Sequence, residues 1–215
     1  GHLLENLEKY DEAVAQYEKA LTLDPSKTDL YQNISTACEQ KNDYKKAISA
    51  YQRYYASLGK EEQTPDLQFQ LGRLYYGAGT QPDSLVITPD ERKQALAAAD
   101  SVFQTIAAAA PDNYLGNFWR ARANSALDPE TTQGLAKPFY EEVTALLESK
   151  NDSRYHAALI ECYSYLGYYY LLAIEDPAQK AQAVANRDKS KEYWSKILAL
   201  DPDNATAQKA LNGIR

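Results

Sequence analysis

Few side chains in the sequence have the types and spacing that catalysis or metal binding requires. The two histidines, His2 and His156, have no cysteine, aspartate or second histidine at the spacing of a metal ligand set. Residues 77–79 read Gly-Ala-Gly, but no predicted strand precedes them, and the remaining glycines and the lysine of a phosphate-binding loop are absent. Adjacent carboxylates such as Glu141 and Glu142 fall on helix faces that we expect to be solvated. We therefore expect a non-enzymatic protein with no catalytic residue, no metal and no cofactor.

Composition and charge narrow the classes of partner. The 215 residues are 44% hydrophobic and 25% charged, which is ordinary for a globular chain. Lysine and arginine together number 23 against 30 aspartates and glutamates, a formal net charge of −7. The basic surface of a nucleic-acid-binding protein is therefore absent, and we expect no nucleic acid partner. The sequence has no run of 18 apolar residues, so we expect no direct membrane insertion.

The sequence repeats itself at a fixed interval. Small and aromatic residues recur 34 residues apart in the first quarter of the chain, and such a period indicates stacked supersecondary units. The pairs are Tyr10 and Tyr44, Ala13 and Ala47, Tyr17 and Tyr51, and Pro25 and Gly59. Within each copy the small, aromatic and apolar residues fall at i, i+4 and i+7, which is one face of an amphipathic helix.

This period and these positions resemble the tetratricopeptide repeat (TPR) family. Its first-helix signature is matched by Tyr163-x2-Leu166-Gly167-x2-Tyr170 and, in part, by Leu71-Gly72-x2-Tyr75. Its second-helix signature recurs as Ala99, Phe103, Ile106 and Pro111; as Ala136, Tyr140 and Val143; and as Ser190, Trp194, Ile197 and Pro202. The resemblance implies an all-α fold: a right-handed α-solenoid of TPR helical hairpins with a C-terminal cap helix.

The resemblance also divides the chain into repeats. The predicted divisions are a truncated hairpin at 1–27, a TPR at 28–61, a TPR at 62–111 with a long insert at about 77–94, a TPR at 112–148, a TPR with extended helices at 149–202, and a cap helix at 203–215. First helices are expected at 28–41, 64–77, 112–126 and 153–173, and second helices at 10–23, 44–58, 89–109, 132–148 and 177–199. Prolines after Asp24 and Asp201 are expected to end the helices that precede them.

The insert ends in a helix-start pattern. Thr88 stands in the N-cap position, Pro89 in the first helical position and Glu91 where a capping box requires an acid. Residues 85–87 are Leu-Val-Ile, an apolar stretch in a polar loop. Asp176 followed by Pro177 predicts a second capped start in the last hairpin.

The resemblance implies that certain first-helix positions face a concave groove in which a peptide lies. Together with surplus tyrosines on the same helices, the candidate partner-binding residues are Gln32, Thr36, Glu39, Phe69, Arg73, Tyr76, Phe118, Arg122, Tyr165 and Tyr168. Aromatic residues and arginine are typical of binding hot spots. Arg73 and Arg122 could each hold a carboxylate in a bidentate way, although either could instead form an ordinary exposed or intrahelical pair.

Two functions follow as alternatives. The first is a TPR scaffold that mediates protein–protein interaction by binding a peptide or partner protein, either on its concave face or at its apolar insert. The second is an envelope-associated TPR-like protein that binds a glycan or another small ligand, which the tyrosines would suit. Gln32 and Thr36 do not reproduce the Lys/Asn pattern of the TPR clamps that hold chaperone tails, which disfavours a cochaperone role.

The start of the sequence and its cysteines bear on assembly and compartment. Gly1 falls at the eighth position of a repeat, so we expect more repeats upstream and homodimerisation through residues 1–23. Cys38 and Cys162 fall three repeats apart and are predicted to be buried free thiols. Two cysteines fit either redox compartment. A start without Met is compatible with a removed export signal, which favours a bacterial cell envelope, with the cytoplasm as the alternative.

Overall fold

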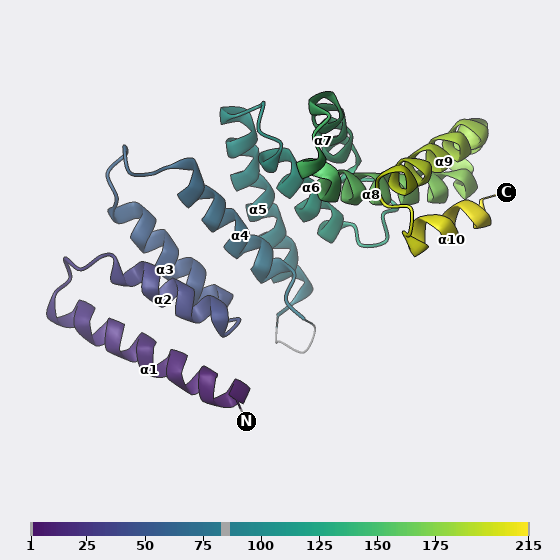
Figure 1. The fold of residues 1–215 in the computed structure, drawn as a ribbon. Helices are drawn as coiled ribbons and strands as arrows, with labels where there is room; N and C mark the ends of the chain where they lie inside the picture. The colour runs from purple at the N-terminus through teal and green to yellow at the C-terminus, as the bar shows by residue number, and fades with distance from the viewer. Residues whose placement is uncertain (1, 83–86, 215) are drawn as a thin grey trace. The chain divides into compact units, whose positions relative to one another are not determined.

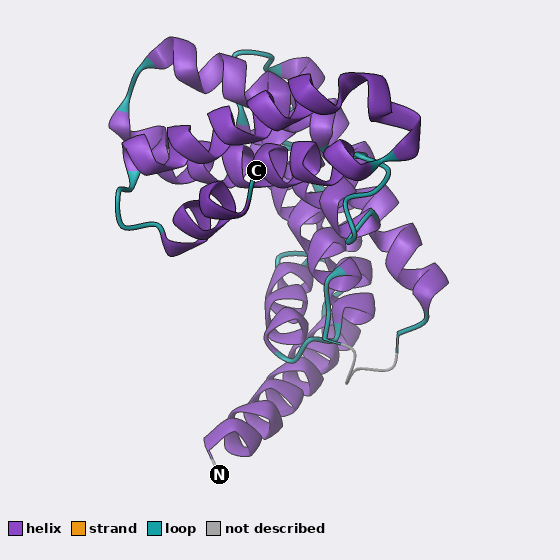
Figure 2. Cartoon of the chain, turned by 90° about the vertical axis from the view of Figure 1, so that its right-hand side faces the viewer, coloured by secondary structure: helices purple, strands orange, loops and turns teal. Residues whose placement is uncertain are grey.

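The computed structural model describes residues 2–82 and 87–214, with side chains from residue 9 onward. The described residues form ten α-helices and two short 3-10 helices (Figure 1). The α-helices are α1 (His2–Leu23), α2 (Leu30–Gln40), α3 (Tyr44–Ser57), α4 (Pro65–Gly79), α5 (Pro89–Ala109), α6 (Leu115–Leu127), α7 (Lys137–Lys150), α8 (His156–Glu175), α9 (Ala183–Leu200) and α10 (Ala205–Gly213), and the 3-10 helices are η1 (Ser153–Tyr155) and η2 (Pro177–Gln182). No strand occurs in this part of the chain (Figure 2), so the predicted all-α class is confirmed.

The chain divides into two compact units, Gly1–Ile106 and Ala107–Arg215. In the N-terminal unit α1 packs against α2, α2 against α3, and α3 against α4. In the C-terminal unit α6 packs against α7, α7 against α8, α8 against α9, and α9 against the short α10. Within each unit, these helices that follow each other in the sequence are thus neighbours in space, which is the arrangement of antiparallel helical hairpins.

The predicted small and aromatic positions of the second helices form the centre of each hairpin. Four helices carry a small residue followed four positions later by an aromatic residue, and every one of these side chains is at most 4% exposed. The pairs are Ala47 and Tyr51 in α3, Ala99 and Phe103 in α5, Ala136 and Tyr140 at the start of α7, and Ser190 and Trp194 in α9. The 3.6-residue period of the sequence therefore identified the buried stripe of these helices.

Glycine in a first helix lies against the aromatic residue of the second. A Cβ atom at Gly72 would lie 2.7 Å from the ring of Phe103, and one at Gly167 would lie 2.8 Å from the ring of Trp194. Neither position has room for a larger side chain without movement of the ring. The glycines of the first-helix signature are therefore the points at which the two helices of a hairpin approach most closely.

The capping box predicted before α5 is formed. The backbone N–H of Thr88 donates to the Glu91 carboxylate over 2.9 Å, and the N–H of Glu91 donates to the Thr88 hydroxyl over 3.2 Å. Of the apolar stretch 85–87, Leu85 and Val86 lie outside the described residues, whereas Ile87 is partly buried. The side chain of Asp176 caps the next start by accepting from the N–H of Ala178, but the helix that begins there is the 3-10 helix η2 rather than an α-helix.

Three predicted helix starts are wrong. The helix expected from residue 10 begins at His2, and the α-helix expected from residue 177 begins at Ala183. The second helix expected at 132–148 begins at Lys137, because the preceding residues form a loop around Asp128. The buried Asp128 carboxylate accepts from the N–H groups of Gln133 and Gly134, over 2.9 Å and 2.8 Å. Gly134 has a φ of 65°, which is left-handed backbone that an α-helix does not contain. These bonds hold the segment as a loop although its residues continue the helical pattern.

Candidate functional site

The candidates on α2 form one polar face in the N-terminal unit. Gln32 and Thr36 are exposed and Glu39 is partly exposed, at spacings that place all three on one side of the helix. The Thr36 hydroxyl donates to the backbone carbonyl of Gln32 over 3.1 Å. The amide of Gln32 and the carboxylate of Glu39 are the polar groups that this face offers to a partner.

The candidates on α4 combine two aromatic rings with one guanidinium. Phe69 is half-buried, with its ring edge-on to Phe103 at 5.5 Å between centroids, and Tyr76 is also half-buried. Arg73 is exposed, and its Nη1 donates to the side chain of Gln70 over 3.5 Å, a long and weak hydrogen bond. Arg73 is therefore available to a ligand, whereas Phe69 serves mainly to pack the hairpin.

The phenol of Tyr44, the first residue of α3, links the two candidate helices. Burial raises the pKa of Tyr44, the carboxylate of Glu39 raises it further, and the guanidinium of Arg73 lowers it. Both charges therefore act on the same phenol, although Glu39 of α2 and Arg73 of α4 are 34 positions apart in the sequence.

In the C-terminal unit Arg122 already holds a carboxylate of the protein itself. Its Nε and Nη2 donate to the two oxygens of Glu161 over 2.8 Å and 2.6 Å, and the Tyr140 hydroxyl donates to the same carboxylate over 3.0 Å. The guanidinium also lies over the rings of Phe118 and Trp119, at 4.5 Å and 4.9 Å from their centroids. Arg122 thus uses its bidentate donor pair to join α6 and α8, so its pair is neither the exposed nor the intrahelical pair considered from the sequence.

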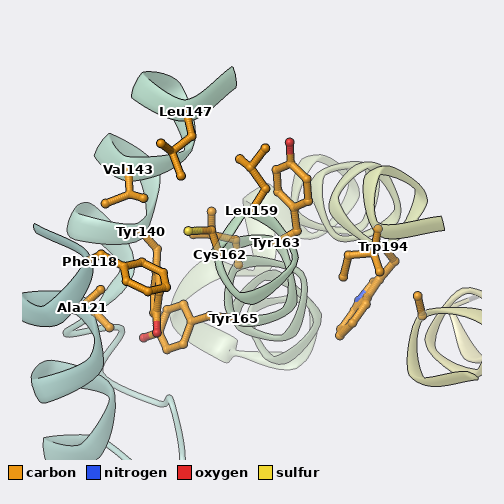
Figure 3. Packing of buried hydrophobic residues seen from close by; sticks show 14 of the residues in the cluster. Phe118, Ala121, Tyr140, Val143, Leu147, Leu159, Cys162, Tyr163, Tyr165 and Trp194 are labelled. Atoms are coloured by element: carbon orange, nitrogen blue, oxygen red, sulfur yellow. The ribbon is translucent and has the colours of Figure 1, made fainter. Parts of the chain in front are cut away.

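Phe118 and Tyr165 were predicted to face a partner and are buried instead (Figure 3). Phe118 is 5% exposed and lies edge-on to Tyr140, and Tyr165 is 9% exposed with its ring 4.8 Å from that of Tyr140. Burial raises the pKa of Tyr165 to about 12. The sequence assignment failed here because both helices are buried on several sides, so the repeat pattern does not fix which side faces solvent. The buried residues include Gly116, Phe118, Ala121 and Ala123 in α6, and Leu159, Cys162, Tyr165 and Leu166 in α8.

Most other tyrosines of α8 are structural. Tyr163 and Tyr170 stand in signature positions, are buried, and donate their hydroxyls to Glu148 and Glu141 of α7 over 2.8 Å and 2.9 Å. Tyr168 differs, because it is 41% exposed. Tyr168 is thus the one aromatic candidate of the described part of α8 that a ligand could reach.

The described residues also bear on metal binding, thiol chemistry and membrane insertion. No group of three or more His, Cys, Asp or Glu side chains among them is arranged to hold a metal ion. Cys38 and Cys162 are free and buried, as predicted, and burial raises the pKa of both thiols. No helix in the described ranges has the length and apolar content needed to span a membrane.

A cavity that the sequence did not indicate lies in the N-terminal unit. Its volume is about 530 Å³, and it is bounded by the beginnings of α3 and α5 and the end of α4. None of the ten predicted binding residues lines it. The signal that could have drawn attention to it is the alanine-rich run 95–99 next to an insert, since small residues leave space between helices.

Helical hairpins that meet through glycine, alanine and aromatic side chains define an α-helical repeat protein. The model of the tetratricopeptide repeat matches residues 1–27 and 28–62. The structure is similar to the C-terminal part of a TPR repeat-containing protein from Cytophaga hutchinsonii, with 30% identity, a TM-score of 0.68 and coverage of 92% of this chain. This chain spans 65% of that structure, slightly less than two thirds of its length.

Two more distant structures share the fold. A thermophilic TPR protein from Thermus thermophilus is 17% identical, with a TM-score of 0.50 and coverage of 98% of this chain and 93% of the other. YrrB, described as a TPR protein with an unusual peptide-binding site, is 19% identical, with a TM-score of 0.56 and coverage of 98% and 88%. The comparison with curated proteins found no match. These findings confirm the predicted resemblance: residues 1–62 match the model of the tetratricopeptide repeat, and the fold resembles that of TPR proteins of known structure. Repeats of this family generally mediate protein–protein interactions.

Proposed function

We propose that the protein is a non-enzymatic scaffold that binds a peptide segment of a partner protein on the face to which α2 and α4 contribute Glu39 and Arg73. The observation that carries this proposal is the exposed guanidinium of Arg73, whose hydrogen bond to Gln70 is long, at 3.5 Å. An exposed arginine with only a weak hydrogen bond inside the protein can donate two parallel hydrogen bonds to a carboxylate. The expected ligand therefore carries an acidic side chain or a chain terminus that reaches Arg73.

The neighbourhood of Arg73 supports a specific rather than a diffuse contact. The charges of Glu39 and Arg73 both act on the Tyr44 phenol, so we infer that a ligand paired with Arg73 also meets an acceptor and a phenol. Gln32 and Thr36 extend the polar face along α2. YrrB, which has this fold, is described as having a peptide-binding site, which is a precedent for this class of ligand. Phe118, Tyr165 and Arg122 are omitted from the proposed site because they are buried or paired.

The test is affinity capture with this chain as bait, followed by titration with the purified partner. The variants are Arg73→Ala and, as a matched control, Arg53→Ala, which removes an exposed arginine from α3. Hot-spot truncation typically costs about 2 kcal/mol or more, so we expect Arg73→Ala to weaken binding by about 30-fold. Arg53→Ala should bind like the unmodified chain. Equal binding by all three proteins would show that the partner does not use Arg73.

A glycan or other small ligand is the second candidate, and the exposure of Tyr168 favours it. An exposed aromatic ring of this kind can pack against the apolar face of a ligand. In that case Tyr168→Ala abolishes binding to an immobilised glycan panel and Arg73→Ala leaves it unchanged. Tyr168→Phe is the control, because it keeps the ring and removes only the hydroxyl.

A further inference from the structure

The cavity bounded by α3, α4 and α5 in the N-terminal unit has walls that are fixed by close helix contacts. A Cβ atom at Gly77 would overlap the ring of Tyr44, and one at Gly79 would lie 2.5 Å from a leucine side chain of α5. The last turn of α4 is therefore packed tightly against both neighbouring helices. Arg92 of α5 also donates a hydrogen bond to the backbone carbonyl of Gln81 over 2.6 Å. A site with walls fixed in this way needs little ordering of the protein when a ligand binds.

The interior of the cavity is mainly apolar and includes two aromatic rings. Its volume of about 530 Å³ falls in the range of about 300–1,000 Å³ that is usual for ligand pockets. The rings belong to Tyr44 and Tyr75, and the small side chains beside them are Ala78, Ala95 and Ala98. Because alanine fills little volume, this lining leaves space for one aromatic or branched aliphatic group. The size and the lining therefore suit a small ligand with an apolar body.

The charged side chains of the lining carry a net negative charge. They are the carboxylates of Asp43 and Glu91 and the ammonium of Lys45. Hydrogen bonds from Thr88 lower the pKa of Glu91, and the charge of Lys45 lowers it further. Glu91 is therefore charged at neutral pH, and Lys45 compensates it. The lining has no second cationic side chain to compensate the carboxylate of Asp43.

Asp43 is the carboxylate that a cationic ligand can reach. It is exposed, and its Oδ1 accepts from the N–H of Lys46 over 3.1 Å, whereas its Oδ2 accepts no hydrogen bond from the described residues. The ammonium of Lys46 forms an ion pair with Glu18 of α1 over 2.8 Å. A ligand ammonium has three N–H donors and no acceptor, so Oδ2 of Asp43 is a suitable partner for it. Charge complementarity thus favours a cationic over an anionic ligand.

We propose that this cavity binds a small organic amine. The aromatic or branched apolar body of the amine lies against the three alanines and beside the two tyrosine rings, and its ammonium donates to Oδ2 of Asp43 at the rim. Burial of the apolar body supplies most of the affinity, and the exposed carboxylate supplies the preference for a cation.

The cavity shares one side chain with the proposed peptide site, because Tyr44 is also the phenol on which the charges of Glu39 and Arg73 act. The amine site does not rest on the peptide site. Its test needs no partner protein and changes neither Tyr44 nor Arg73, so failure of one proposal can be told from failure of the other.

The test follows NMR signals of the isotope-labelled chain during titration with three compounds that share an indole body and differ in charge. They are tryptamine, which is cationic at neutral pH, tryptophol, which is neutral, and indolepropionate, which is anionic. We expect tryptamine to shift the signals of Ile48, Ala78, Ala95 and Ala98 with a Kd of about 1 mM or lower. Tryptophol should bind up to about fivefold more weakly, and indolepropionate more weakly still.

Asp43→Asn removes the charge and can keep the helix cap, since asparagine and aspartate cap helices about equally well. We expect this variant to bind tryptamine only as tightly as tryptophol, and to bind tryptophol as the unmodified chain does. The control is Asp66→Asn, which removes an exposed carboxylate from the first turn of α4, outside the cavity. It should leave both affinities unchanged.

Two alanines of α5 provide a matched pair of blocking variants. Ala98 lines the cavity, whereas Ala97, its neighbour in the sequence, is exposed and does not line it. Ala98→Leu should abolish the shifts that tryptamine causes, and Ala97→Leu should keep them. If Ala98→Leu does not fold by circular dichroism, Gln94→Trp, which changes an exposed rim residue, replaces it, with the exposed Gln104→Trp of the same helix as control.

Other outcomes would overturn the proposal. Shifts that do not saturate, that stay outside the cavity residues, or that persist in Ala98→Leu or Gln94→Trp would show that the amine does not occupy the cavity. Equal affinities for tryptamine and indolepropionate, or a preference for tryptamine that survives Asp43→Asn, would contradict the ammonium contact. Binding of a blocked Lys-Leu-Trp-Lys tetrapeptide at the same residues, with no binding of tryptamine, would assign the cavity to a basic peptide instead.

Discussion

Glycine is used in this protein where two helices of a hairpin touch. At Gly72 the ring of Phe103 occupies the space that a Cβ atom would need. Alanine is the better helix former by about 1 kcal/mol, so the glycine weakens α4 as an isolated helix. Gly72 is therefore required by the packing of α4 against Phe103, although it lowers the helix propensity of α4.

Gly72→Ala is expected to lower the free energy of unfolding by about 1–2 kcal/mol, because the cost of overpacking exceeds the gain in helix propensity. Gly213→Ala is the control, since a Cβ there would meet no described atom within 4 Å. It should change stability by less than about 0.5 kcal/mol. Urea unfolding followed by circular dichroism measures the free energy of unfolding of both variants. A Gly72→Ala protein as stable as the control would show that the Phe103 ring can move aside without cost.

Buried tyrosines make the stability of the C-terminal unit sensitive to alkaline pH. Burial raises the pKa of Tyr165 to about 12, whereas an unfolded tyrosine titrates near about 10. The folded state therefore keeps this proton more firmly than the unfolded state. Its contribution to stability is complete below about pH 10 and is lost as the pH rises through about 12.

Tyr165→Phe removes this titration, and we expect the variant to lose less stability than the unmodified chain between about pH 9.5 and 11.5. The difference should reach about 2 kcal/mol near pH 11.5, because two pKa units between the unfolded and folded states correspond to about 2.7 kcal/mol. Urea unfolding at several pH values provides the measurement, and Tyr168→Phe, at an exposed ring, is the control. Parallel pH curves for Tyr165→Phe and the unmodified chain would mean that Tyr165 does not stay protonated in the folded state.

Helix α5 begins with a reciprocal pair of hydrogen bonds between Thr88 and Glu91, and this start also forms part of the cavity rim. Thr88→Ala removes both hydroxyl bonds and is expected to cost about 1 kcal/mol of stability. Amide hydrogen exchange should accelerate in the first turn of α5.

The control for this change is Thr105→Ala in the same helix. The hydroxyl of Thr105 donates to the backbone carbonyl of Ser101 in the middle of α5, a bond that does not stabilise a helix. Thr105→Ala should therefore be neutral or slightly stabilising. If both variants exchange and unfold alike, the capping box does not determine where α5 begins.

One face of α1 is less covered than the equivalent face of α3. Ala13 and Tyr17 occupy the same repeat positions as Ala47 and Tyr51 of α3, but they are partly exposed where the α3 pair is at most 2% exposed. Homodimerisation through residues 1–23 remains a prediction, and partly exposed apolar side chains on this face are consistent with it.

Analytical ultracentrifugation over a range of concentrations tests the predicted homodimerisation through residues 1–23. We expect a dimer that Tyr17→Glu disrupts, because a charge would be placed among apolar side chains, while the nearby exposed Gln16→Glu has no effect. A strict monomer at high concentration would contradict the prediction.

The hairpins could be predicted from the sequence because their signals are local. A small residue and an aromatic residue four positions apart lie on one side of any helix, and the same pair recurs in α3, α5, α7 and α9. Proline and the capping residues mark where helices begin and end. The start of α7 was missed because the bonds of Asp128 that hold the preceding loop join backbone groups five and six residues away.

The candidate site was predicted less well, because exposure and pairing are properties of the packed structure. The sequence determined that the chain folds into TPR hairpins and which residues fill their centres, since both follow from spacing along single helices. Only the tertiary structure decided that Phe118 and Tyr165 are buried and that Arg122 pairs with Glu161, 39 residues away, while Arg73 stays exposed. The physical reason is that two similar arginines on similar helices differ only in what the neighbouring helix presents to them.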